Sequence, residues 1–214
     1  MFISDNDVLK ISFDCRDNRE EENAWKKNFS KLISKKLVLK EILNFTEPSK
    51  CYGEELFCAY SDRPVVHKVA ISIEFADLES GRREFVFSIV SELLNFIKKL
   101  FYRDAVNLNQ VKLFLLKWGE TAGTEFYRSA ASPNVVSKIK ESILNNPTSQ
   151  QSNIKGFITE LSDLKIKTGP NIDLFVHIGT TDFSNIDVKS LAGAGNDEAI
   201  RQILKKSIWV TIET

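Results

Sequence analysis

Apolar residues repeat along this chain with two different periods, and they predict both strands and helices. A period of two runs through residues 8–13 and again through His67–Phe75, which is typical of half-buried strands. The pair Ser80-Gly81 is a turn signal, and apolar residues alternate once more over 84–89. We therefore predict a β-hairpin that spans approximately residues 67–89.

Elsewhere the apolar residues recur at helical spacing or form short β-rich runs. The predicted helices are 23–40, 90–101, 135–144, 154–161 and 198–206, and the further strands are 111–118, 172–178 and 208–212. The polar stretch 145–153 is predicted to be a flexible loop. The length of 214 residues favours one globular domain over residues 1–214.

The order of these elements predicts an α+β fold. It has an antiparallel or mixed sheet with the hairpin at its centre, and several helices cover the sheet. Strands and helices do not alternate regularly along the chain, which disfavours a doubly wound parallel sheet.

Charge and cysteine content limit the classes of function. Lys plus Arg and Asp plus Glu number 29 each, so no net field attracts nucleic acid or membrane to the whole molecule. Cys15, Cys51 and Cys58 are an odd set without CxxC spacing, which indicates a reducing compartment. No apolar run reaches the ~18 residues of a membrane span. We expect a soluble intracellular protein of the cytoplasm or nucleus.

The segment around Asp173, Asp187 and Lys189 resembles the site of PD-(D/E)xK nucleases. In that family two carboxylates hold a divalent cation, here Mg²⁺, and a lysine lies near the attacking water. The resemblance implies that Asp173 and Asp187 are ligands and that Lys189 activates the water. The alternative interpretation is a solvated turn without metal or cofactor.

Asp173 and His177 also share a strand face. The expected role of His177 is that of a histidine hydrogen-bonded within the sheet.

The predicted helix 23–40 carries a lysine-rich face. Its candidate binding residues for nucleic acid are Lys26, Lys27, Lys31, Lys35 and Lys36. A solvated face of an amphipathic helix has the same composition, so both interpretations stand.

Several aromatic residues lie in or beside predicted loops. They are Tyr52, Phe57, Tyr60, Phe126 and Tyr127. Exposed aromatic residues are enriched at protein interfaces, although the same residues can belong to the core.

The segments His67–Ile73, Glu79–Gly81 and Phe85–Ile89 resemble the central hairpin of HORMA domains. That resemblance implies an adaptor that traps a partner peptide under a movable C-terminal segment, without catalysis. Residues 90–153 have no counterpart in the order of that family, and the chain is not assigned to it.

These observations favour a non-enzymatic protein–protein interaction module, an adaptor or an assembly subunit. Its expected partner is another protein or a second copy of the chain. A metal-dependent nuclease and a nucleic-acid-binding protein that uses the basic helix are the alternatives.

Overall fold

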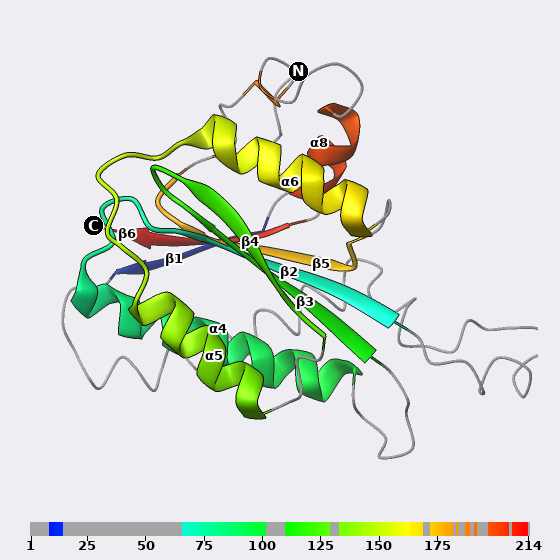
Figure 1. Ribbon diagram of the computed structural model, residues 1–214, viewed down its shortest axis with the longest axis horizontal. Helices are drawn as coiled ribbons and strands as arrows, with labels where there is room; N and C mark the ends of the chain where they lie inside the picture. The colour runs from blue at the N-terminus through cyan, green and yellow to red at the C-terminus, as the bar shows by residue number, and fades with distance from the viewer. Residues whose placement is uncertain are drawn as a thin grey trace, which may run out of the picture.

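The protein is built on one six-stranded sheet, seen nearly edge-on in Figure 1. The computed structural model describes residues 9–14, 66–101, 110–128, 133–168, 172–181, 183, 187, 188, 191, 197–205 and 207–213. The strands are β1 (Leu9–Asp14), β2 (Val66–Glu74), β3 (Gln110–Trp118), β4 (Ala122–Tyr127), β5 (Leu174–Gly179) and β6 (Ile208–Glu213). The helices named here are α4 (Ser80–Phe101), α5 (Pro133–Leu144), α6 (Ile154–Thr168) and α8 (Asp197–Lys205).

The strands lie in the order β1-β6-β5-β2-β3-β4, and only β4 runs antiparallel to its neighbour. The chain leaves β2 through α4 and adds β3 and then β4 on one side. It later returns to the other side of β2 with β5, and α8 leads on to β6. The direction of the winding therefore reverses between β2 and β5. In open sheets of this kind, the crevice beyond the carboxyl ends of the strands at such a reversal is the usual place for a functional site.

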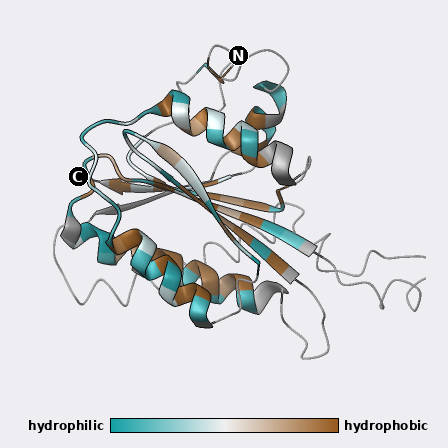
Figure 2. Ribbon diagram, viewed as in Figure 1, coloured by the Kyte–Doolittle hydropathy of each residue, from teal (hydrophilic) through white to brown (hydrophobic). Residues whose placement is uncertain are grey.

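Helices cover both faces of the sheet, α4 and α5 on one face and α6 and α8 on the other (Figure 1). Successive strand residues point to opposite faces, so each strand contributes to both apolar layers. Val69, Ile71 and Ile73 of β2 pack in the layer with α4, whereas Ala70 packs in the layer with α6. Figure 2 shows the largely apolar strands between helices whose surfaces are mixed. Strands buried on both faces read as nearly continuous apolar runs, which explains the composition of β3 and β5.

The expectation of a mixed sheet covered by helices is confirmed, but the hairpin across 67–89 is wrong. Residues 80–101 form the single helix α4. Its fully buried residues are Val86, Ile89, Val90, Leu93, Leu94 and Ile97, which recur at helical spacing. Phe85 and Phe87, whose alternation with Ile89 indicated a strand, are only partly buried. With the second strand of the hairpin absent, the main support for the HORMA resemblance is lost.

Strand β4 is present although the sequence did not predict it. Its residues are Ala-Gly-Thr-Glu-Phe-Tyr, and each of them is at least partly exposed. An edge strand of mixed polarity lacks the regular alternation from which strands are recognised. Gly119 and Thr121 close the turn before it, since the amide of Gly119 donates to the carbonyl of Thr121 at 2.9 Å. Phe126 and Tyr127 therefore lie on a strand and not in a loop.

The other predicted elements are confirmed within a few residues at β1, β3, β5, β6, α5 and α8, and α6 extends further than predicted. The predicted helix 23–40, with its lysine-rich face, lies outside the described residues, as do Tyr52, Phe57 and Tyr60. The flexibility of 145–153 stays a prediction, and the hydrogen bonds of this segment are given below.

Candidate functional site

Polar side chains gather where β2 and β5 end, at the reversal of the winding. Glu74 is the last residue of β2 and is 3% exposed, and His177 on β5 is 1% exposed. We call these residues the Glu74 cluster, which consists of Ser72, Glu74, Trp118, Ser152, His177, Thr180 and Thr181. Four of its residues come from three adjoining strands, β2, β3 and β5, and the other three belong to the segments that precede α6 and follow β5.

The carboxylate of Glu74 accepts hydrogen bonds from two separate segments. The amides of Thr180 and Thr181 each donate to Oε2 at 2.8 Å, and the Thr181 hydroxyl donates to Oε1 at 2.6 Å. The hydroxyl of Ser152 also donates to Oε1. Two successive amides aimed at one oxygen form a concave anion site. A buried carboxylate is stable only with such partners, so these donors offset its loss of hydration.

His177 is connected to β2 and β3 through the hydroxyl of Ser72. Nδ1 of His177 lies 3.2 Å from the Ser72 Oγ, and Nε1 of Trp118 donates to the same oxygen at 3.1 Å. An indole N–H can only donate, so the serine's own hydrogen is free to point at Nδ1. We therefore assign Nδ1 as the acceptor and place the proton of the neutral imidazole on Nε2.

The surroundings of His177 are aromatic, which keeps its ring uncharged near neutral pH. Phe183, Trp118 and Phe157 have ring centroids 4.7, 5.8 and 6.2 Å from the imidazole. Burial lowers the pKa of His177 to about 4, and the nearby charge of Glu74 opposes this effect only in part. Nε2 is buried and has no hydrogen-bond partner among the described residues. A buried polar atom without a partner is unusual and needs an explanation.

Gly179, the last residue of β5, leaves room for these two groups. A Cβ atom built on it would lie 2.5 Å from Oε2 of Glu74 and 3.0 Å from Nε2 of His177. The two polar atoms therefore flank the same small space. Any side chain at position 179 would displace one of them, so glycine is required here by close approach.

The segment 145–153 is hydrogen-bonded to the carboxyl ends of β2 and β3. The amide of Asp77 donates to the carbonyl of Ser149 at 2.8 Å, and the amide of Glu120 donates to the Ser149 Oγ at 2.7 Å. The amide of Asn153 donates to the carbonyl of Gly119 at 2.7 Å. These bonds position Ser152 over Glu74. Asp77, at φ 53°, is a non-glycine residue with a left-handed backbone and lies in the same region.

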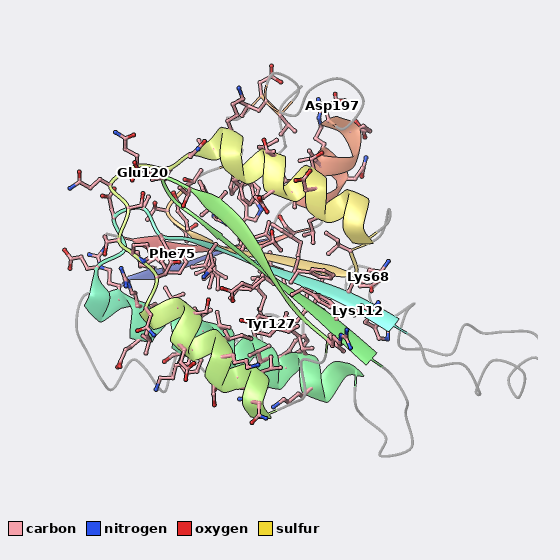
Figure 3. The ribbon with its side chains drawn as sticks, viewed as in Figure 1. Lys68, Phe75, Lys112, Glu120, Tyr127 and Asp197 are labelled. Atoms are coloured by element: carbon pink, nitrogen blue, oxygen red, sulfur yellow. The ribbon has the colours of Figure 1, made fainter. Side chains whose placement is uncertain are left out.

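Asp173 lies at the opposite end of the sheet, immediately before β5. Its Oδ2 accepts the amide of Lys68 at 2.7 Å and lies 3.9 Å from Nδ1 of His67. Lys68 and Lys112 are in register on β2 and β3 and lie at this end, whereas Phe75 and Glu120 lie beyond the other end (Figure 3). The described contacts give Asp173 the role of joining the start of β5 to β2.

Of the three residues of the nuclease hypothesis, the structure describes only Asp173 and Asp187. Asp187 is exposed and follows the end of β5, whereas Asp173 precedes its start, and Lys189 lies outside the described residues. Among the described residues no group of three or more His, Cys, Asp or Glu side chains is placed to hold a metal ion. The Mg²⁺ site therefore stays a prediction of the sequence, and so does nucleic-acid binding by Lys26, Lys27, Lys31, Lys35 and Lys36.

The expected role of His177 is confirmed, since it is hydrogen-bonded within the sheet. Sequence reasoning missed Glu74, although a signal was present. Ser72 and Glu74 interrupt an otherwise apolar strand, and His177 interrupts another. Such interruptions in strands buried on both faces indicate polar groups that must find partners inside the fold.

The comparisons with known proteins identify no family. No protein-family model matches the chain, and no curated protein matches it. One solved structure, described as an uncharacterized membrane spanning protein from Vibrio fischeri, is 11% identical to it. The match covers 68% of this chain and 91% of that one with a TM-score of 0.28, and it supports no argument. In the described part of this chain, no helix combines the length and apolarity that a membrane crossing requires.

Proposed function

We propose that this protein is a non-enzymatic protein–protein interaction module, an adaptor or assembly subunit, that binds its partner along the outer edge of β4. The observation that carries the proposal is the position of Phe126. Its side chain is 49% exposed on the strand that ends the sheet. Exposed aromatic residues are common anchors of protein interfaces.

Phe126 belongs to a small aromatic pair. It is in register with Phe114 of β3, and their ring centroids are 5.1 Å apart. Phe114 is 8% exposed, so Phe126 partly covers it. A partner side chain that packs on Phe126 would complete the burial of both rings.

The backbone of β4 supplies the second part of the proposed interface. One side of β4 pairs with β3, and among the described residues no strand pairs with its other side. A peptide in extended conformation can add to such an edge through main-chain hydrogen bonds. Glu125 of β4, paired with Lys117 at 2.6 Å, is partly exposed beside Phe126. A charge on an edge strand discourages indiscriminate strand pairing, which favours a specific partner.

Site-specific photocrosslinking tests the proposal. A photoreactive phenylalanine replaces Phe126 in the full chain, and a matched protein carries it at Ser137, an exposed residue of α5 on the other side of the sheet. We expect discrete cross-linked products from position 126 and none from position 137. A product of twice the chain mass would identify self-association. Equal cross-linking from both positions, or none from 126, would refute the interface.

A second experiment measures the contribution of the aromatic side chain. The Phe126→Asp variant should bind the partner that cross-linking identified at least tenfold more weakly than the wild type does. The Ser137→Asp variant should bind it as tightly as the wild type. Both variants should keep their thermal unfolding transitions, because both positions are exposed.

We further propose that the module works inside the cell, in the cytoplasm or nucleus, as its cysteine content indicates.

A further inference from the structure

Two segments that are distant in sequence depend on the same carboxylate. Ser152 precedes α6, and Thr180 and Thr181 follow β5, yet all three donate to Glu74. The orientation of the Glu74 side chain therefore controls both segments at once. Displacing the carboxylate would leave two backbone amides and three hydroxyls without their acceptor.

His177 gives that carboxylate an alternative partner. In the part of the chain that the structure describes, Nε2 of His177 has no hydrogen-bond partner, and it faces the same space beside Gly179 as Oε2 of Glu74. While the imidazole is neutral, the attraction of its N–H for Glu74 is weaker than that of the five hydrogen-bond donors on the two segments. A charged imidazolium would change this balance, because charge-assisted hydrogen bonds are about twice as strong as neutral ones.

A second proton on His177 must bind at Nδ1, where the Ser72 hydroxyl donates in the neutral state. The serine would then lose its acceptor, and a full positive charge would lie in an aromatic surrounding. Among the described residues, the groups that face the ring are Ser72 and Glu74 from β2, Trp118 from β3, Phe157 from α6, and Phe183 after β5. Of these, only Glu74 can neutralise the charge.

We propose that Glu74 and His177 form an acid-operated latch. At neutral pH, Glu74 holds Ser152 to the segment of Thr180 and Thr181. In acid, Glu74 turns to the imidazolium of His177 and releases both segments together. The depressed pKa of His177, about 4, is consistent with a latch that stays closed at neutral pH.

Amide hydrogen exchange measured by NMR on the full chain tests the latch. The probes are the amides of Thr180 and Thr181, and the reference is the amide of Phe75, which donates to the Trp118 carbonyl at 2.7 Å. Between pH 7 and about pH 4.5, we expect the protection factors of both threonines to fall at least tenfold relative to Phe75. Unchanged ratios over this range in the folded protein would overturn the proposal.

Three variants separate the latch from general acid sensitivity. Glu74→Gln keeps the side-chain shape without the charge, and His177→Phe keeps an aromatic ring without the proton, so both should abolish the selective loss. Ser152→Ala removes one donor at an exposed residue and should move the midpoint toward neutral pH. The same acid-dependent loss in Glu74→Gln as in the wild type would contradict the latch. If the two buried variants do not fold, an unmoved midpoint in Ser152→Ala would contradict it equally.

Discussion

Ser72 and His177 are register partners on β2 and β5, and their side chains meet at 3.2 Å on the face that α6 covers. This contact spans the place where the winding of the sheet reverses. Trp118 extends it to β3. The polar chain therefore ties three adjoining parallel strands together inside an aromatic layer, where a mispaired polar group would be costly.

The burial of His177 predicts an acid-sensitive fold. Its pKa is lowered to about 4 in the folded protein, against 6.5 for an unperturbed histidine, because burial disfavours the charged form. The unfolded chain therefore binds the proton more readily between these values. The sign follows from linkage: stability is highest above about pH 6.5 and is lost as the pH falls toward 4, on the order of 3 kcal/mol in total.

Chemical unfolding between pH 7.5 and pH 5 checks this dependence against a His177→Phe variant. The variant should show a shallower loss of unfolding free energy over this range. His67 also has a lowered pKa because of burial, so it contributes to the dependence that remains. Parallel curves for wild type and variant would contradict the assignment to His177.

Gly179→Ala is expected to destabilise the protein. The new Cβ would lie 2.5 Å from Oε2 and 2.6 Å from Cβ of Glu74, which is closer than atoms approach without displacement. Overpacking of this kind costs roughly 1–3 kcal/mol. Gly123→Ala is the matched control, because a Cβ there meets nothing within 4 Å, and we expect a change of about 0.5 kcal/mol or less. Equal unfolding free energies for the two variants would show that the structure accommodates a methyl group at position 179 without displacing its neighbours.

Arg83 is expected to stabilise the junction after α5 more than its neighbour Arg82 does. Nη1 of Arg83 donates to the carbonyl of Leu144 at 2.9 Å, and Nη2 donates to the Thr148 hydroxyl at 2.5 Å. Arg83→Met keeps much of the apolar stem and removes these donors, so we expect a loss of about 1–3 kcal/mol. Arg82→Met, on the partly exposed adjacent residue, should change stability by about 0.5 kcal/mol or less. Thermal unfolding of the pair measures the difference, and comparable losses would argue against a role for these two hydrogen bonds.

The strands were predictable from sequence where both layers demand apolar residues. Periodicity placed β3 and β6 within two residues of their bounds, because strands in the middle of a covered sheet have few polar positions. Edge strand β4 escaped detection for the opposite reason, since Thr124 and Glu125 are hydrogen-bonded at the surface and need no apolar alternation. The pairing of distant strands, such as β2 with β5, has no local signature.

The candidate site was only partly visible in the sequence. His177 could be identified, because histidine is rare in this chain and lies in an apolar run. Glu74 also interrupts an apolar run, but its role could not be predicted, since that role depends on Ser152 and Thr181, which are 78 and 107 residues away. Long-range polar contacts of this kind follow from the topology and not from local pattern.

The segment 80–89 is where local pattern and tertiary structure disagree most, and one substitution tests the outcome. In α4, Val86 is fully buried, whereas a hairpin with Phe85, Phe87 and Ile89 inward would expose it. A carboxylate at this position cannot be paired in the apolar layer. Val86→Asp should therefore cost at least ~3 kcal/mol or prevent folding.

Asn95→Asp introduces the same side chain at an exposed position of α4 and should leave the unfolding free energy within about 0.5 kcal/mol of wild type. Far-UV circular dichroism and urea unfolding on both variants measure the contrast. The helix requires a large difference between them, because Val86 lies in the apolar layer between α4 and the sheet and Asn95 is exposed. Similar stabilities would mean that residue 86 faces solvent, and the hairpin would then have to be reinstated.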